Sequence, residues 1–139
     1  MAFVTDIDHL SLAISHATAP AFMLGAVAGF LSILIARLER VADRARNVRG
    51  GEPGLDPKGE IASSLSRRLE LLSRAIYFAV LSALVTAALL IGAFGAALMG
   101  IGHGAIVAVM FAVALALLIA SLVDFAREMR LYMRLMHVD

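Results

Sequence analysis

The stretch that decides the fold is residues 75–123, which read AIYFAVLSALVTAALLIGAFGAALMGIGHGAIVAVMFAVALALLIASLV. These 49 residues contain no Lys, Arg, Asp or Glu. One helical crossing of a bilayer needs about 20 apolar residues, so the stretch is too long for one span and about right for two. The turn-like sequence Gly100-Ile101-Gly102-His103-Gly104 predicts the break between them.

A second uncharged run covers residues 9–36, so the sequence predicts an all-α integral membrane protein with three transmembrane helices. The chain is 61% apolar and 17% charged, with a mean hydropathy of +0.90, whereas a soluble domain is about 25% charged. It has no cysteine, which excludes disulfides and thiol catalysis. A net charge of +1, without a basic tract interleaved with aromatic residues, argues against nucleic-acid binding.

Charges and turn residues divide the chain into seven predicted segments. Thr18 and Pro20 suit the start of the first transmembrane helix, as cap and first-turn residue. Residues 37–48, 60–74 and 125–136 are expected to form a cytosolic helical stalk, in which 60–74 runs antiparallel to the extension of the first helix. The segments are an extracytoplasmic amphipathic segment at 1–19, transmembrane helix one with its cytosolic extension at 20–48, a loop at 49–59, a cytosolic helix continuing into transmembrane helix two at 60–99, an outer turn at 100–104, transmembrane helix three at 105–123 and a cytosolic tail at 124–139.

The basic residues predict the orientation. Nine of the 12 lie between the first and second spans and three follow the third span. Basic residues gather on the cytoplasmic side of membrane proteins, so the N-terminus is expected outside and the C-terminus in the cytoplasm. The first 36 residues hold no Lys or Arg, so the first apolar run is interpreted as a retained helix and not a cleaved signal.

Small residues recur every fourth position in each span. Such stripes let helix backbones approach closely in a bilayer, where burying apolar surface gives no driving force. Two compatible interpretations follow: the stripes pack within one chain, or at least one stripe faces another protomer of a homo-oligomer. The stripes comprise Ala21, Gly25 and Gly29, then Gly92 and Ala96, then Ala108, Ala112 and Ala116.

The predicted spans contain no ionisable side chain, which argues against a proton relay or ion pump. Their polar residues are Ser32, Ser82, Thr86 and Ser121, each expected to bond to its own helix. The alternative is that Ser82 and Thr86, which share a face, line a pore at an oligomer axis. Asp124, at the end of span three, is expected to pair with Arg127. It could instead reach Arg37 or Arg40, or form a ring around a symmetry axis.

Charged residues of the stalk allow two interpretations. Arg67 and Glu70, and Glu70 and Arg74, have helical spacings that permit ion pairs. The arginine faces either set the topology and attract anionic headgroups, or dock a cytosolic protein partner or a phospholipid. The residues concerned are Arg37, Arg40, Asp43 and Arg44 on the first helix, Arg67, Glu70 and Arg74 on the second, and Arg127, Arg130 and Arg134 on the third.

Three histidines are predicted on the outer side. Asp6, His9, His16 and His103 could meet as a metal site or a pH sensor. His9 and His16 are seven residues apart, which is too far to chelate one ion without a third element. The simpler interpretation is that they are hydrated residues at the membrane interface. No cofactor is expected.

Three blocks carry a family resemblance. They are residues 38–46, LERVADRAR, residues 66–76, SRRLELLSRAI, and residues 126–129, AREM, of which Asp-Arg-Ala-Arg and Arg-Arg are the most specific. The chain resembles, over about residues 10–135, the small bacterial inner-membrane proteins of domain of unknown function twenty-seven twenty-one. The resemblance implies three spans and a bacterial plasma membrane, and no activity.

The sequence shows no nucleophile–base pair, phosphate loop or paired carboxylates, so an enzyme is not expected. The favoured hypothesis is an oligomeric structural or scaffold subunit whose stalk binds partners. The alternative is an oligomeric ion channel or pore with the transmembrane helices around a central axis. A weaker alternative is an outer-face metal or pH sensor.

Overall fold

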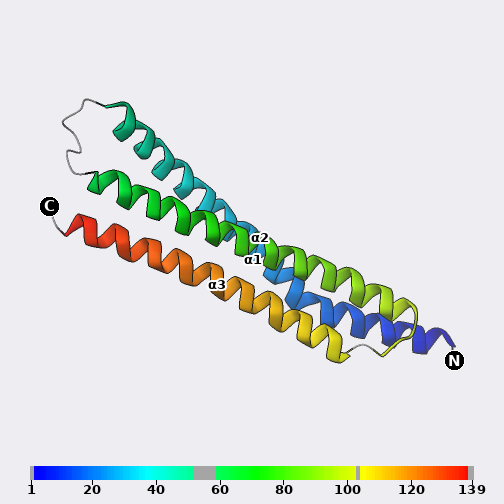
Figure 1. The fold of residues 1–139 in the computed structure, drawn as a ribbon. Coiled ribbons are helices and arrows are strands. Elements are labelled where there is room, and N and C mark those ends of the chain that lie inside the picture. The colour runs from blue at the N-terminus through cyan, green and yellow to red at the C-terminus, as the bar shows by residue number, and fades with distance from the viewer. Residues whose placement is uncertain (1, 52–58, 103, 138–139) are drawn as a thin grey trace.

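The structure, a computed structural model, describes residues 2–51, 59–102 and 104–137. In this part of the chain the backbone forms three long helices, α1 (Ala2–Gly50), α2 (Glu60–Leu98) and α3 (Gly104–Met136). They lie along one common axis, with α2 antiparallel to α1 and α3 (Figure 1). The start of α1 and the end of α3 therefore lie at opposite ends of the molecule (Figure 1).

Each of the three helices is long and apolar enough to cross a membrane. The predicted all-α fold with three such helices is confirmed. The break between α2 and α3 also falls where the sequence predicts it, because Gly100 adopts a positive φ of 66° that side chains rarely tolerate. The predicted loop at 49–59 lies largely outside the described residues.

The first helix differs from its prediction. α1 runs without interruption through Pro20, so the expected helix start at that residue is wrong. The Thr18 hydroxyl donates to the Ile14 carbonyl at 3.0 Å, one turn back in the same helix, and does not cap a new one. A proline inside a helix removes one backbone hydrogen bond. The residues on both sides of Pro20 remain α-helical, and Pro20 itself is buried.

α2 is the middle helix and packs along both α1 and α3, whereas the backbones of α1 and α3 come close to each other at few positions. Its buried residues alternate at spacings of three and four, which is the pattern of side chains that interlock between helices crossing at a shallow angle. We call this buried line, with the residues facing it, the seam. On α2 it comprises Leu65, Arg68, Leu72, Ala75, Ala79, Ser82, Thr86 and Leu89. Facing it are Met23, Val27, Leu34 and Val41 of α1 and Ala114, Ser121, Asp124 and Glu128 of α3.

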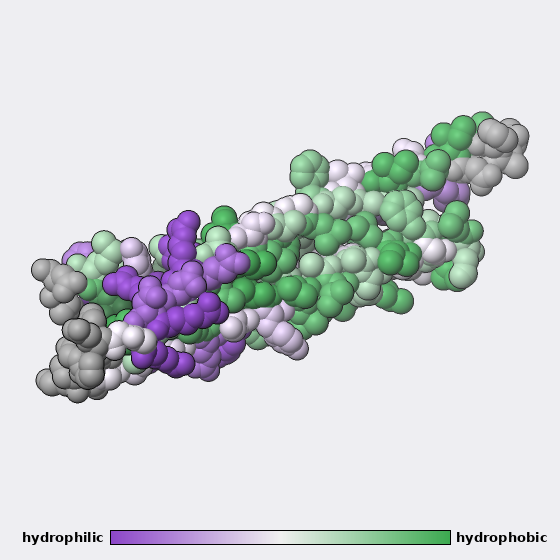
Figure 2. Space-filling model, turned by 90° about the horizontal axis from the view of Figure 1, so that it is seen from above, coloured by the Kyte–Doolittle hydropathy of each residue, from purple (hydrophilic) through white to green (hydrophobic). Residues whose placement is uncertain are grey.

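Hydrophilic side chains gather at one end of the bundle, and most of the remaining surface is hydrophobic (Figure 2). We call residues 37–51, 59–74 and 124–137 the charged end, and residues 9–36, 75–102 and 104–123 the apolar part. At the charged end, the start of α2 runs antiparallel beside the end of α1, with Val41 and Leu65 buried. The end of α1 and the start of α2 are thus antiparallel neighbours.

Candidate functional site

A buried carboxylate joins the three helices at the charged end. Glu128 of α3 is 0% exposed. Its Oε1 accepts hydrogen bonds from Nε and Nη2 of Arg68 on α2, at 2.9 and 2.7 Å. Its Oε2 accepts one from Nη1 of Arg37 on α1, at 2.9 Å. One carboxylate of α3 therefore contacts both other helices. Its bond to Arg37 links α3 to α1, two helices whose backbones come close to each other at few positions.

Two aromatic rings cover this cluster. The Arg68 guanidinium lies 5.0 Å from the centroid of the Tyr132 ring, and that of Arg37 lies 5.4 Å from the Phe125 ring. Arginine stacks favourably on aromatic faces, more so where water is excluded. Phe125 also meets Phe30 of α1 edge-on, at a centroid distance of 5.5 Å. Ion pairs and ring contacts thus fix the same layer of the bundle.

The cluster matters for how the three helices are positioned relative to one another. A buried ion pair gives little net stability over an apolar pair, but removing one partner leaves an uncompensated buried charge and costs several kcal/mol. Glu128 accepts hydrogen bonds from both arginines in one arrangement of the three helices. We infer that it fixes their register and rotation, a role for which buried polar groups are best attested.

Sequence reasoning missed Arg68 and Glu128 as site residues. A signal was present, because Glu128 lies seven residues after Ser121 and fourteen after Ala114, on the same helical stripe. Arg68 falls between Leu65 and Leu72 in the alternating spacing of the α2 seam. A charged residue at a seam position predicts a buried partner on the facing helix.

Asp124 lies one turn before Glu128 and is also buried. Its carboxylate is 3.9 Å from Arg127, the predicted partner, and 3.6 Å from Arg74 of α2. The suggested contact with Arg37 or Arg40 is not formed, since Arg37 is engaged by Glu128. A side chain buried within one chain and paired this way does not leave a free carboxylate for a ring at a symmetry axis.

A groove lies between α2 and α3 at the charged end, with a volume of about 980 Å³. We call it the arginine groove. Five arginines and one carboxylate line it, so its charge is strongly positive. Its lining residues are Ser63, Ser66, Arg67, Glu70, Leu71 and Arg74 from α2 and Arg127, Arg130, Leu131 and Arg134 from α3.

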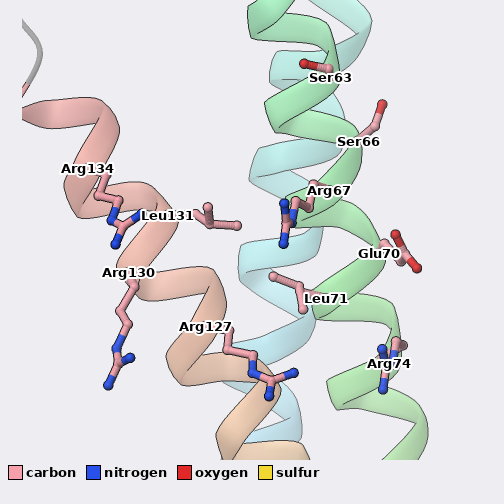
Figure 3. Close-up of a pocket in the computed structure, with 10 residues that line it drawn as sticks. All are labelled: Ser63, Ser66, Arg67, Glu70, Leu71, Arg74, Arg127, Arg130, Leu131 and Arg134. Carbon is pink, nitrogen blue, oxygen red and sulfur yellow. The ribbon is translucent and has the colours of Figure 1, made fainter.

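The close-up shows how these side chains lie (Figure 3). Leu71 and Leu131 point into the space between the helices, and Arg127 reaches from α3 toward α2. Glu70 points away from α3 (Figure 3). Glu70 forms no ion pair with Arg67 or Arg74, so both predicted pairs are wrong in the described structure. Arg74 turns toward Asp124, a buried carboxylate, in place of its exposed neighbour.

Hydroxyls of the apolar part are used inside the bundle. Ser82 of α2 donates to the Ala114 carbonyl of α3 at 2.8 Å, and Ser121 of α3 donates to the Ala75 carbonyl of α2 at 2.6 Å. The prediction that these two bond to their own helix is wrong, because both lie on the seam. Ser32 and Thr86 do bond to their own helices, to the carbonyls four residues back.

Most of the small-residue stripes do not pack inside the chain. A Cβ placed on Gly25, Gly29 or Gly92 would meet no atom within 4 Å. Ala21, Ala112 and Ala116 are also exposed. The interpretation that these residues pack within one chain is therefore wrong, because the seam takes other positions of the same helices. The interpretation that a stripe faces another protomer stays a prediction.

Ala96 and Ala108 border a cavity of about 500 Å³ near the Gly100 turn. His9 and His16 of α1 line the same cavity, so the two histidines share a face as expected. Among the residues that the structure describes, no three His, Asp or Glu side chains could hold a metal ion. His103 and the side chain of Asp6 lie outside the described residues, so the four-residue metal site stays untested.

The remaining predicted stalk residues lie on the surface. Arg40 and Arg44 are exposed on α1. Asp43 pairs with Arg46 at 3.5 Å, with both side chains largely exposed, and such pairs contribute little to stability. The charged end therefore has a buried, paired layer beneath a hydrated, mostly unpaired one.

Fold and site define the class: an all-α protein with three helices able to span a membrane, tied at one end by buried ion pairs. The chain belongs to the family described as protein of unknown function (DUF2721), whose model matches residues 17–138. The family resemblance seen in the sequence is thus confirmed. Searches of curated proteins and of solved structures found no match.

Proposed function

We propose that the protein is a structural subunit of the bacterial plasma membrane that presents a rigid cytosolic stalk. The observation that carries this proposal is the Glu128 cluster. It ties α1, α2 and α3 together at the point where each helix leaves its apolar run. Beyond the cluster α1 continues for about 20 Å, and α2 and α3 for about 12 Å, at the usual rise per residue. A tied bundle of this length suits a scaffold that holds a binding surface at a fixed distance from the bilayer.

The placement follows from charge. The N-terminus lies outside and the C-terminus in the cytoplasm, because all 12 basic residues then fall on the cytoplasmic side. The outward arginines of the α1 extension, Arg40 and Arg44, form the surface proposed for an acidic cytosolic protein partner. They are exposed and form no ion pair within the described residues.

We further propose that the subunit is a homo-oligomer that associates through α1. Gly25 and Gly29 present bare backbone on a face that no other helix of the chain covers. Helices associate in bilayers by close backbone approach at such positions. Ser82 and Thr86 cannot line a pore between protomers in this conformation, because both side chains are completely buried inside one chain.

The test is the mass of the purified protein in detergent, measured by light scattering with the detergent subtracted. Wild type is expected at a multiple of 14.7 kDa, and Gly29→Leu at the monomer mass. Ala88→Leu is the control, since it also introduces a leucine in place of a small residue at an exposed position, on α2. A monomeric wild type would contradict the homo-oligomer, and an unchanged Gly29→Leu assembly would contradict association through α1. Planar-bilayer recordings are expected to be silent.

A further inference from the structure

We propose that the arginine groove binds the phosphate of an anionic phospholipid headgroup. The groove is built from both α2 and α3, and five of its ten lining residues are arginines against a single glutamate. Guanidinium groups bind phosphate oxygens through paired hydrogen bonds, which makes arginine the preferred residue for this anion. The proposal rests on the membrane placement given above.

Three of the five arginines have no partner among the described residues. Arg74 and Arg127 both approach Asp124, at 3.6 and 3.9 Å. No ion pair or hydrogen bond engages Arg67, Arg130 or Arg134 within residues 2–51, 59–102 and 104–137. The only carboxylate in the lining, Glu70, points away from α3 (Figure 3). Their positive charge is therefore available to a bound anion.

The position of the groove favours a lipid over a soluble anion. Its two ends differ. Arg74 directly precedes the apolar run of residues 75–123 and Arg127 follows that run by one helical turn, whereas Ser63 and Arg134 lie farther out. In the proposed membrane the Arg74 end lies at the level of the headgroups.

The same helix faces continue as apolar surface beyond that end. Tyr77 follows Arg74 by three residues and Val123 precedes Arg127 by four, and both are exposed. Residues three and four apart lie on one face of a helix. A phospholipid fits both surfaces, with its phosphate at the arginines and its acyl chains along Tyr77 and Val123. An acidic peptide or inorganic phosphate would contact only the arginines, and not the apolar surface at Tyr77 and Val123.

The experiment titrates the full-length protein in detergent with phosphatidylglycerol, and in parallel with phosphatidylcholine of the same acyl chains, and counts retained lipids by native mass spectrometry. The groove variant is the double substitution Arg67→Gln, Arg130→Gln. Both residues are exposed and unpaired, so we expect unchanged helical content by circular dichroism. The control is Arg40→Gln, Arg44→Gln, which removes the same charge from exposed positions of α1.

The control removes arginines that lie about as close to the apolar run as those of the groove variant. Arg40 lies closer along the chain to its apolar run than either Arg67 or Arg130, so general attraction to anionic lipid would suffer at least as much in the control. A guanidinium–phosphate contact is a charge-assisted hydrogen bond worth about 1.5 kcal/mol, so the groove variant, which loses two such contacts, should bind phosphatidylglycerol roughly 100-fold more weakly. The control should stay near wild type, and both wild type and control should bind phosphatidylcholine at least about tenfold more weakly than phosphatidylglycerol.

Four results would overturn the proposal. They are equal losses in the two double variants, no preference of wild type for phosphatidylglycerol, complete displacement of the lipid by an equal concentration of glycerol phosphate, and tighter binding of a polyglutamate peptide than of the lipid. None depends on the oligomer mass, so failure of the lipid site and failure of the proposed assembly are separate outcomes.

Discussion

The apolar part and the charged end share one seam but fill it with different residues. In the apolar part the middle of the α2 seam is Ala75, Ala79, Ser82 and Thr86. There the Ser82 hydroxyl donates to α3, and the Ser121 hydroxyl of α3 donates back to α2. At the charged end it is Leu65, Arg68 and Leu72, with Glu128 opposite. The spacing continues unchanged from one part into the other.

The difference fits two surroundings. In lipid, burying a leucine gains nothing over leaving it exposed, so close approach of small residues and hydrogen bonds hold helices together. In water, burying leucine is favourable, and charged groups can be buried only when paired. The change of seam chemistry near Ala75 and Asp124 therefore marks the proposed boundary between the two media.

The largest expected effect comes from Glu128→Ala at the charged end. It leaves Arg68 buried without a counter-charge, and breaking a buried pair costs about 3–5 kcal/mol of unfolding free energy. The measurement is the midpoint of thermal unfolding in detergent, followed by circular dichroism. Glu70→Ala is the control, because Glu70 is exposed and forms no ion pair in the described structure. Equal midpoints for the two variants would mean that the cluster does not hold the helices.

Leu72→Ala probes the apolar seam residues of the charged end. Leu72 is completely buried, and truncating a buried leucine costs about 2–5 kcal/mol. Leu84→Ala, at a side chain that is 61% exposed in the apolar part, should cost almost nothing in detergent. If the two midpoints fell together, burial of Leu72 would not stabilise the charged end.

Ser121→Ala probes the hydroxyl bonds of the apolar part. It removes the hydrogen bond to the Ala75 carbonyl, and bonds between membrane helices average about 0.6 kcal/mol, up to about 2 kcal/mol. Unfolding in mixed micelles with rising sodium dodecyl sulfate is the suitable assay. Ser32→Ala serves for comparison, since that hydroxyl is exposed and bonds only to its own helix. A larger loss for Ser32→Ala than for Ser121→Ala would refute the assignment.

The smallest effect is expected for Asp43→Asn. The Asp43–Arg46 pair is largely exposed, and surface pairs of this kind are worth about 0–1 kcal/mol. Its thermal midpoint should match wild type within error and be insensitive to salt. A loss comparable to that of Glu128→Ala would show that the surface charges, and not the buried ones, stabilise the charged end.

The sequence predicts the number, type and approximate limits of the helices, because uncharged runs and glycines mark them directly. It fails where tertiary packing decides. Thr18 and Pro20 are residue types that favour the start of a helix, as cap and first-turn residue. In the structure, however, α1 runs through both of them. Spacing alone also leaves open which face of each helix turns inward. Hence the sequence leaves open whether the glycine stripe of α1 packs within the chain or faces another protomer. It also does not identify Arg68 and Glu128 directly, although their seam positions indicate them.

The central claim is that the charged end and the Gly100 turn lie on opposite sides of a bilayer. The chain has no cysteine, so Arg44→Cys and Gly102→Cys each introduce a single reactive thiol. Intact right-side-out cells or spheroplasts are treated with a membrane-impermeant maleimide. We expect labelling of the thiol at position 102 without lysis, and of the thiol at position 44 only after lysis. Labelling of both positions from the same side of the intact membrane would contradict it.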